Sequence, residues 1–436
     1  MPGTTRDDAG VVPAGRDGRL PMSWQQEGLW FLQLLNPAAA TLHLPMAMRL
    51  RGELEPAALR ESLRLLVARH EGLRTRFEQV AGVGYQVIDP APAGVQLPVV
   101  ELPVAGWQGL VAEEVRRPFV LEEQWPLRWW LGRLAERDHV LVVTVHHIAA
   151  DGRSVAILAR ELRECYAAVR SGRQPELEPA VLSVQSADYA VWQRRHGEQR
   201  LAAGLEYWQR QLTGLVELEF PADRARPVQP SGAGAGFTGL IPAEVGAGLG
   251  ELATELRVPL LSVLLAGLLV VLHRYTGQQD LAVGSVSSGR GRAELEPMLG
   301  CFVNPVVLRT SVAGDPSFTE LVGRCRDTVL GALEHQDVPF TAVVDALHPE
   351  RIPGRNPLFQ ISLTLSAEGP AEPDTPDLAG LAVERIDLPS AGTWHDLSVN
   401  VSPRADGSLA VSVEYSVELF DADRIQRLVK HWQTAF

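Results

Sequence analysis

The stretch from residue 139 to residue 169 constrains the fold most strongly. His139 to Ile148 is a continuous apolar run rich in β-branched residues, and it predicts a central strand with both faces buried. After Asp151-Gly152, apolar residues recur at helical spacing from Val155 to Val169, with Ser154 available as the N-cap. The sequence therefore predicts a strand, a tight turn and a helix, as in a mixed α/β protein.

Other segments predict helices and strands in both halves of the chain. An amphipathic helix begins at Pro56, which suits the first helical turn. Leu260 to Leu272 is a thirteen-residue apolar run. Because a membrane span needs about 20 residues, this run predicts a buried core helix. Leu397–Val401 and Leu409–Tyr415 alternate like strands, and Asp421–Phe436 predicts a final helix.

The length of 436 residues suggests two or three domains at about 150 residues each, or two large lobes. Residues 1–18 are polar and aperiodic, which predicts a flexible tail or linker, with order beginning near Pro21. Ala222 to Gly236 carries prolines and glycines without an apolar period, and it predicts the connection between lobes. We therefore expect an N-terminal lobe at 19–221 and a C-terminal lobe at 222–436. An acidic, proline-rich loop is expected at Ala367–Pro376.

Charge and residue counts exclude several classes of protein. Forty basic and fifty-three acidic residues give a net charge of -13, which repels a phosphate backbone and argues against nucleic-acid binding. Lys430 is the only lysine. A P-loop needs a lysine directly after a glycine, and a pyridoxal enzyme needs a buried lysine, so both classes are excluded.

The cysteines and the N-terminal residues bear on the cellular compartment. Cys165, Cys301 and Cys325 are scattered and form no CxxC pair, so neither a disulfide framework nor a zinc site is indicated. The first residues are polar and contain no apolar signal core. We therefore expect a cytoplasmic protein that is neither secreted nor bound to a membrane.

Several reactive side chains gather after the predicted central strand, in His146-His147-Ile148-Ala149-Ala150-Asp151-Gly152. Successive strand residues point to opposite faces, so only one of the two histidines can face a cleft. Asp151 in the turn can hold a backbone amide or an arginine, and Gly152 tolerates the positive φ of a tight turn. A neutral imidazole can accept a proton from an amine or alcohol that attacks an acyl group, or donate a hydrogen bond to the intermediate.

Other interpretations of this heptapeptide stay open on local chemistry. A metal site would use histidine and aspartate, but adjacent strand histidines diverge and no third ligand cluster lies nearby in the sequence. A structural pair of core histidines before an Asp-Gly turn is the default interpretation of these seven residues alone. A serine hydrolase would need a G-x-S-x-G elbow, which the sequence lacks.

The heptapeptide resembles the HHxxxDG signature of nonribosomal peptide synthetase condensation domains, which are relatives of chloramphenicol acetyltransferase. Six further stretches resemble the family's other signatures and occur in the family's order: Ser23–Leu32, Arg69–Phe77, Asp188–Gln193, Gly300–Pro305, His335–Phe340 and Arg355–Gln360. The seven matches run from residue 23 to residue 360 and so cover most of the chain. On these motifs the chain is identified as a member of the family.

The resemblance implies an α/β sandwich fold, with two acetyltransferase-like lobes forming a V-shaped pseudo-dimer around a central tunnel. It implies that two phosphopantetheine arms enter the tunnel, one with a donor acyl thioester and the other with an acceptor aminoacyl group. The implied reaction is amide bond formation, without an intrinsic cofactor or metal. The implied partners are donor and acceptor peptidyl carrier domains and an adjacent adenylation domain.

The resemblance also implies roles for individual residues. His147 would face the tunnel, as a general base or as a hydrogen-bonding group, and His146 would be structural. Asp151 would be architectural, in a bidentate pair with Arg290, or with Arg292 as the second candidate. Gly152 would allow the close approach of the turn to the arm. For Asn304, two roles are equally expected: binding groups in the tunnel, or satisfying buried backbone.

Three positions depart from the family's commonest pattern: Arg153 replaces a tryptophan, Pro305 a threonine and Thr341 a glutamate. They bear on substrate subtype and lobe contacts. Three other activities are alternatives: an epimerising enzyme, an ester-forming enzyme with a hydroxyl acceptor, and a catalytically silent docking platform that recruits another enzyme. The Phe-Val-Asn and Pro-Leu-Phe-Gln stretches argue against epimerisation. The intact His147, Asp151 and Gly152 argue against the docking platform.

Overall fold

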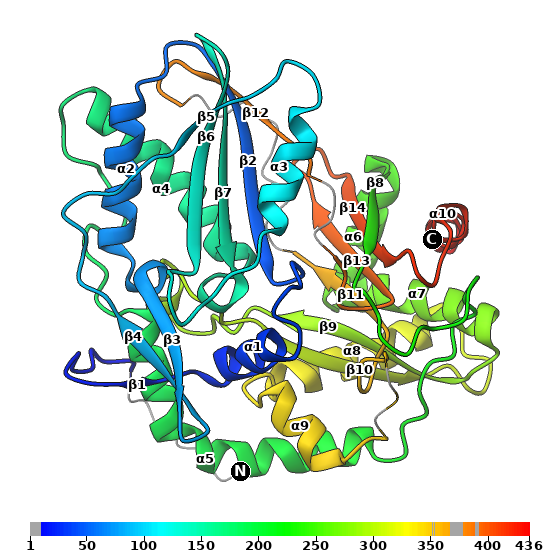
Figure 1. Ribbon diagram of the computed structural model, residues 1–436. Coiled ribbons are helices and arrows are strands. Elements are labelled where there is room, and N and C mark those ends of the chain that lie inside the picture. The colour runs from blue at the N-terminus through cyan, green and yellow to red at the C-terminus, as the bar shows by residue number, and fades with distance from the viewer. Residues whose placement is uncertain (1–9, 351, 353, 367–377, 389–391) are drawn as a thin grey trace.

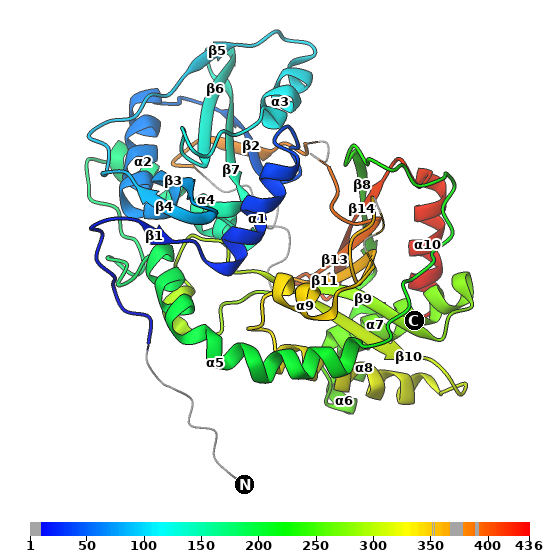
Figure 2. The ribbon, with the colours of Figure 1, turned by 60° about the horizontal axis from the view of Figure 1, so that its bottom comes forward.

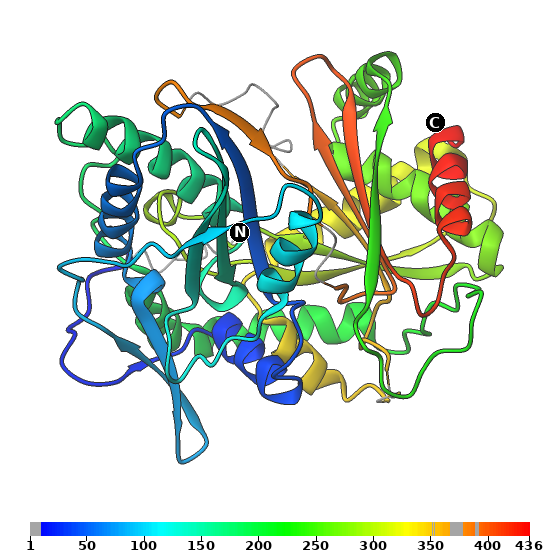
Figure 3. The same cartoon turned by 45° about the horizontal axis from the view of Figure 1, so that its top comes forward.

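The computed structural model describes all of the chain except residues 1–9, 351, 353, 367–377 and 389–391. Two large sheets dominate the fold, and Figure 3 shows them side by side, with β2 in dark blue and β8 in green. One sheet has five strands in the order β12-β2-β7-β6-β5, and the other has six in the order β10-β9-β11-β13-β14-β8. The mixed α/β fold class predicted from the sequence is confirmed.

The five-stranded sheet lies between helices on both of its faces (Figure 1). Its central strand β7 alternates between two buried surfaces. Leu141, Val143 and Val145 belong to the apolar cluster formed with α2 and α4, whereas Val140 and Val142 pack with α3. Burial on both faces explains the continuous apolar run, as predicted. The elements of this half are β2 (His43–Arg51), β5 (Val99–Glu101), β6 (Leu127–Ala135), β7 (Asp138–His146), α2 (Pro56–Arg69), α3 (Trp107–Arg116) and α4 (Gly152–Arg170).

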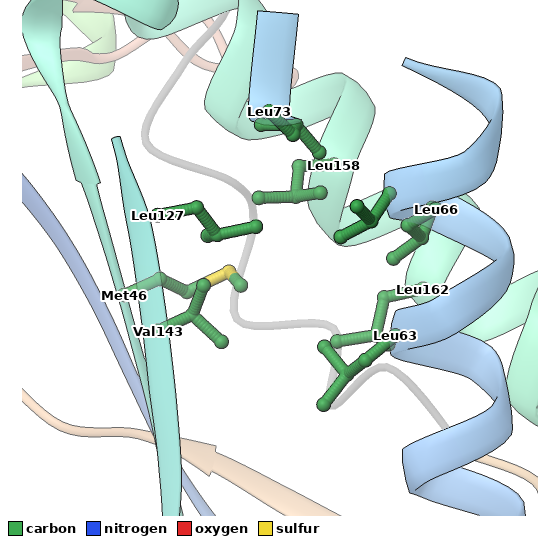
Figure 4. Close-up of a pocket in the computed structure, with 9 residues that line it drawn as sticks. Met46, Leu63, Leu66, Leu73, Leu127, Val143, Leu158 and Leu162 are labelled. Atoms are coloured by element: carbon green, nitrogen blue, oxygen red, sulfur yellow. The ribbon is translucent and has the colours of Figure 1, made fainter. Parts of the chain in front are cut away.

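The core between this sheet and its helices is closely packed. In Figure 4, Met46 and Val143 on the strands point toward Leu63, Leu66 and other apolar side chains on α2 and α4. The cavity left between them has a volume of about 10 Å³ and an entirely apolar lining. Such a space is at the lower limit for one water molecule and offers it no polar partner, so it is a packing defect rather than a binding site.

A small sheet and helix α1 complete the N-terminal half. The sheet has the order β1-β4-β3. Helix α1 begins with a capping box, in which Ser23 and Gln26 each bond the other's backbone N–H. These elements are β1 (Leu20–Pro21), β3 (Thr75–Val80), β4 (Val83–Ile88), α1 (Trp24–Leu35) and the short 3-10 helix η1 (Glu71–Arg74).

The six-stranded sheet packs against helix α7, whose residues from Ser262 to Leu269 are all buried. The predicted core helix is thus confirmed. Among the described residues no single helix is long and apolar enough to cross a membrane; α6 and α7 reach that length only as a pair bent by 111°. The elements are β8 (Gly234–Ile241), β9 (Asp280–Ser287), β10 (Asn304–Ser311), β11 (Ile361–Leu365), β13 (Leu397–Pro403), β14 (Leu409–Ser416), α6 (Ala243–Leu256), α7 (Leu260–Thr276), α8 (Phe318–Glu334), α9 (Phe340–Leu347) and α10 (Ala422–Thr434).

The two halves are joined by shared elements as well as by the chain connection. Helix α5 (Ser186–Leu212) runs beneath both halves in Figure 2, with Ala187 packed in the first half and Trp208 in the core of the second. Strand β12 (Ala382–Arg385) follows the expected boundary at 222 by 160 residues, yet it pairs with β2 of the first sheet. The expected lobes 19–221 and 222–436 therefore exchange segments. The sequence did not predict this exchange, because pairing between strands far apart in the chain leaves no local pattern.

The expected flexible tail at 1–18 is wrong for its described part. Val11 is buried, and its N–H donates to Glu294 Oε1 at 3.3 Å. Arg16 bonds two carboxylates, with Nε 2.9 Å from Glu71 Oε2 and Nη1 2.6 Å from Asp188 Oδ1. Order thus begins well before Pro21. Residues 1–9 and the expected loop at Ala367–Pro376 lie outside the described residues.

Candidate functional site

His146 is the last residue of β7 and is fully buried. Its Nδ1 accepts a hydrogen bond from the Ile148 N–H at 3.1 Å, and its Nε2 lies 3.2 Å from Gln33 Oε1. Burial lowers the pKa of His146 well below its ordinary value, and the neighbouring His43 and His147 act in the same direction. His146 is thus a neutral ring whose two nitrogens both bond other protein groups. These contacts support the structural role expected for it.

His147 begins the 3-10 helix η2 (His147–Ala149), so the strand ends at His146, two residues earlier than the apolar run to Ile148 suggested. Its backbone N–H donates to Leu42 O at 2.7 Å, and its side chain is half-buried. Nδ1 lies 3.6 Å from Cys301 Sγ. Nε2 makes no hydrogen bond to the described residues. It is also not one of the polar atoms that these residues bury without a hydrogen-bond partner. One ring nitrogen is therefore left for another molecule.

The electrostatics of His147 favour a neutral ring. Burial lowers its pKa. Contact with the backbone of His147 and Ala150 and the negative charge of Asp151 oppose that effect without reversing it. Burial also raises the pKa of Cys301 well above the ordinary value for a thiol, so Cys301 carries its proton at neutral pH. No residue pattern selected Cys301 in advance; its position inside the Gly300–Pro305 stretch was the only available signal.

Asp151 is the N-cap of α4, and it replaces Ser154, the residue expected there. Its Oδ1 accepts from both the N–H and the Oγ of Ser154, each at 2.8 Å. Arg290 Nη2 lies 3.0 Å from Oδ1 and 3.2 Å from Oδ2. The partner of Asp151 is thus Arg290 and not Arg292, but one guanidinium nitrogen contacts both oxygens in place of the expected two-nitrogen fork.

The second terminal nitrogen of Arg290, Nη1, is held by backbone carbonyls. Nη1 donates to Leu295 O and, at 2.9 Å, to Met298 O, while the guanidinium lies 4.5 Å from the centre of the Phe302 ring. The side chains of Asp151 and Arg290 are 1% and 2% exposed. Because both charges are sealed from water, each depends on the other for its solvation.

Ser154 links this turn to the segment from the second half. Its Oγ accepts from the Gly300 N–H at 3.1 Å and lies 2.9 Å from Gly300 O. The Phe302 N–H donates to Asp151 Oδ2 at 3.3 Å. The turn after β7 is therefore fixed between the two halves of the chain, with His147 at its start.

Gly152 does not have the positive φ that the Asp-Gly turn predicted; it is the first residue of α4. The helix begins directly at the turn, so helical backbone angles replace the expected turn geometry. A Cβ placed on Gly152 would meet no atom within 4 Å among the described residues. The described residues thus give no steric reason for glycine at this exposed position.

The contacts of Asn304 favour the second of the two roles expected for it, which is to satisfy buried backbone groups. It is buried at the start of β10, and its Nδ2 donates to Gln336 O at 2.9 Å and to Val338 O at 2.6 Å. Its Oδ1 accepts from the Phe340 N–H at 3.0 Å. Both N–H donors of the amide hold the segment before α9, so neither is left for a ligand.

Two further observations concern metal binding and the residue after Gly152. Within the described ranges, no group of three or more His, Cys, Asp or Glu side chains is arranged to hold a metal ion. Arg153, which stands where tryptophan is common, lies 3.6 Å from Glu296 on the segment that carries Arg290. The site therefore consists of one accessible imidazole, a thiol and a sealed ion pair.

Comparison with known proteins places the chain in a family. The family model described as "Condensation domain" matches residues 16–436. One of the linear gramicidin synthase subunits of Brevibacillus parabrevis is 38% identical over 99% of this chain, which covers 6% of that protein. The dimodular nonribosomal peptide synthase of Bacillus subtilis (strain 168) is 37% identical over 96% of this chain, which covers 18% of it. The chain thus spans a small part of these relatives.

Solved structures with the same fold agree. The X-domain from teicoplanin biosynthesis has a TM-score of 0.87 and 32% identity, with 98% of this chain and 97% of that chain covered. The first condensation domain of the CDA synthetase has a TM-score of 0.78 and 22% identity, with 97% of both chains covered, which shows the shared fold. The family match over nearly the whole length, on a fold that these structures share, shows that the chain belongs to the condensation domain family.

Proposed function

We propose that the chain is a catalytically active condensation domain of a nonribosomal peptide synthetase. It would join a donor acyl or peptidyl thioester to the amine of an acceptor aminoacyl thioester. The observation that carries the proposal is His147, a neutral imidazole whose Nε2 has no protein partner within the described residues, beside a turn locked by Asp151 and Arg290. Such a group suits acyl transfer to an amine.

In the proposed reaction, the acceptor nitrogen attacks the thioester carbonyl and forms a tetrahedral intermediate. The C–S bond then breaks, the amide C–N bond remains, and the proton lost by the nitrogen ends on the departing thiolate. Nε2 of His147 would accept that proton from the nitrogen, or an Nε2–H would donate to the oxyanion. Each tautomer of the neutral ring performs one of these roles.

Cys301 bears on the choice between the two roles. Its protonated thiol at 3.6 Å can donate to Nδ1, which would leave the ring proton on Nε2 and favour the hydrogen-bonding role. If Nδ1–H instead donates to the sulfur, Nε2 is free to act as a base. Because a thioester is already activated, alignment of the two reactants would supply much of the rate in either case.

The proposal includes partners and location. Both substrates would arrive on phosphopantetheine arms of donor and acceptor carrier domains, and the chain itself would hold no cofactor. An adenylation domain would lie next to it, in a cytoplasmic synthetase. The names of the relatives support this setting, since a gramicidin synthase and a dimodular peptide synthase match over almost the whole chain. Residues 19–221 and 222–436 would form the two lobes around the tunnel, with α5 shared between them and β12 added to the sheet of the first lobe.

The test is transfer between loaded carrier proteins, followed by mass spectrometry of the acceptor carrier. His147→Ala is expected to slow transfer by at least about 100-fold, the usual contribution of a positioned acid or base, with an unchanged melting temperature. His431→Ala, on the exposed side of α10, is the matched control and should transfer at the wild-type rate. Transfer by His147→Ala at the wild-type rate would overturn the proposed role.

A docking platform is the second candidate, because the X-domain from teicoplanin biosynthesis is 32% identical and a related structure contains that X-domain in complex with OxyB. On this alternative the chain would recruit a tailoring enzyme and transfer nothing. Absence of transfer with every donor and acceptor pair, together with tight binding of such an enzyme, would favour it. A product with an ester bond would indicate a hydroxyl acceptor.

A further inference from the structure

A second cavity, of about 240 Å³, lies away from the apolar core of the first half. Four separate segments form its walls: the connection between the halves, the stretch before β11, the stretch before β13 and the end of β14 with the residues that follow it. Its lining includes Arg226, Pro230, Asn356, Trp394, His395 and Glu418. None of these residues has a role in the transfer proposed above.

The cavity lies next to the candidate site. Trp394 Nε1 donates to Thr41 O at 3.1 Å, across the junction between the halves. The next residue, Leu42, accepts the hydrogen bond from the His147 backbone N–H at 2.7 Å. The dipeptide Thr41-Leu42 therefore contacts a wall of the cavity at one residue and the candidate catalytic residue at the other.

His395 gives the cavity a neutral hydrogen-bond donor. Asn356 Nδ2 donates to Trp394 O and lies 3.0 Å from His395 Nδ1, so Nδ1 is the acceptor and the ring proton is on Nε2. Nε2 has no hydrogen-bond partner within the described part of the chain and is not sealed there. Burial lowers the pKa of His395 to about 4, which keeps the ring neutral at physiological pH.

Both arginines of the lining already have a carboxylate partner: Arg226 pairs with Asp396, and Arg355 pairs with Glu217, which lies outside the lining, with Nε 2.8 Å from Oε2. Arg226 Nη1 lies 2.8 Å from Asp396 Oδ1 and 3.0 Å from Gly354 O. Glu418 accepts from the Ser231 N–H at 3.0 Å and keeps its negative charge at the cavity. An anionic ligand would thus be repelled by Glu418 and would compete with Asp396 for Arg226.

Trp394 supplies apolar surface beside this donor, since it is 37% exposed while its indole N–H is bonded to Thr41. Pro227, Pro230 and Leu419 extend the apolar part of the lining. At about 240 Å³ the cavity is smaller than the range of about 300–1,000 Å³ that is typical of ligand sites, which suits a single side chain.

We infer that this cavity binds an uncharged side chain of a carried substrate, with a carbonyl or hydroxyl oxygen on His395 Nε2–H and an apolar surface against Trp394. The inference rests on the proposed function for the identity of the substrate. The binding itself does not depend on catalytic activity, because the cavity walls and the His395 donor are present whether or not the chain transfers an acyl group. It predicts selection of neutral, oxygen-bearing side chains over acidic ones of the same size.

The test uses three probes, which are glutamine, glutamate and leucine with the α-carboxyl group converted to an amide. Their side chains are of similar size. Each is titrated into the chain labelled with ¹⁵N-histidine, and the His395 ring signal is assigned by its loss in His395→Phe. Glutamine amide is expected to shift this signal and to bind about fivefold more tightly than leucine amide, as one hydrogen bond allows. Glutamate amide should bind most weakly.

Two variants separate this inference from the proposed function. His147→Ala should bind glutamine amide as the wild type does while its transfer is slowed by at least about 100-fold. His395→Phe should remove the preference for glutamine amide over leucine amide. If His395→Phe does not fold, Trp394→Leu tests the apolar wall by weakening all three probes. A His395 signal that no probe moves, in a chain that transfers, would overturn the inference alone. A shifted signal in a chain that transfers nothing would instead overturn the proposed function.

Discussion

The turn after β7 and the segment before β13 each contain an ion pair between an aspartate and an arginine, but the two pairs differ in their exposure to solvent. Asp151 pairs with Arg290, and Asp396 pairs with Arg226. The side chains of the first pair are 1% and 2% exposed, whereas those of the second are 16% and 25% exposed. Burial decides what such a pair does. The buried pair of Asp151 and Arg290 fixes the backbone around it. The more exposed pair of Asp396 and Arg226 neutralises the wall of a cavity at a lower desolvation cost.

Each region also presents a neutral histidine, and again the surroundings differ. His147 has a thiol beside Nδ1, whereas the Nδ1 of His395 faces the amide of Asn356. The amide defines which nitrogen carries the proton, and the thiol leaves both tautomers accessible. The first arrangement suits a group that moves a proton, and the second suits a fixed donor.

Loss of the sealed pair should have the largest effect. Asp151→Ala leaves the Arg290 charge buried without its partner, and we expect a loss of about 3–5 kcal/mol in the free energy of unfolding. Urea denaturation monitored by tryptophan fluorescence measures this loss. Equal stability of Asp151→Ala and the wild type would remove the architectural role of Asp151.

Acid should reveal the buried His395. Its pKa is lowered to about 4 in the folded chain against 6.5 in the unfolded chain, so the unfolded chain takes up the proton first. Stability from this residue is complete above pH 6.5 and is lost as the pH falls toward 4, by at most about 3 kcal/mol. His395→Phe should lose correspondingly less between pH 7 and pH 4 than the wild type in the same urea titration. An identical pH dependence would show that His395 is not buried as described.

The wetter pair should tolerate loss of its carboxylate. We expect Asp396→Ala to cost about 1–2 kcal/mol, because water can partly solvate Arg226 at this exposure. The same variant should weaken the discrimination against glutamate amide, since Arg226 becomes available to an anion. A cost equal to that of Asp151→Ala would show that exposure does not separate the two pairs.

Replacing the thiol should have the smallest effect on stability and a specific effect on pH dependence. Cys301→Ala removes a weak contact, so we expect less than about 1 kcal/mol of destabilisation. It should shift the pH profile of transfer, because Nδ1 of His147 loses its neighbour. Cys325→Ala, at a buried thiol in the second half, is the control that should leave the profile unchanged. A profile that Cys301→Ala leaves in place would show that the sulfur does not influence His147.

Local sequence patterns predicted the parts of the fold that depend on burial of one segment. The β7 run, the helix after Pro56 and the helix at Leu260 all lie where apolar periodicity placed them. The pairing of Asp151 with a distant arginine came from the resemblance and not from periodicity. Contacts such as Cys301 with His147 join residues 154 apart, and local patterns contain no information on such contacts.

The same limit explains the errors. Ser154 was expected to cap α4 because its type and position fit, but Asp151 takes that role while Ser154 bonds Gly300. The polar residues before Pro21 looked like a tail because they lack periodicity, yet ion pairs hold Arg16. Electrostatic anchoring of an irregular segment leaves no periodic signal in the sequence.

The place of β12 has a practical consequence for dividing this molecule. Residues Ala382–Arg385 cover the edge of β2 over Met48–Arg51. A fragment that stops near residue 221 would leave that edge with unpaired N–H and C=O groups, which is a template for aggregation. Chimeras that exchange halves between synthetases should therefore carry residues 378–388 with the N-terminal partner, or supply an equivalent strand from the host.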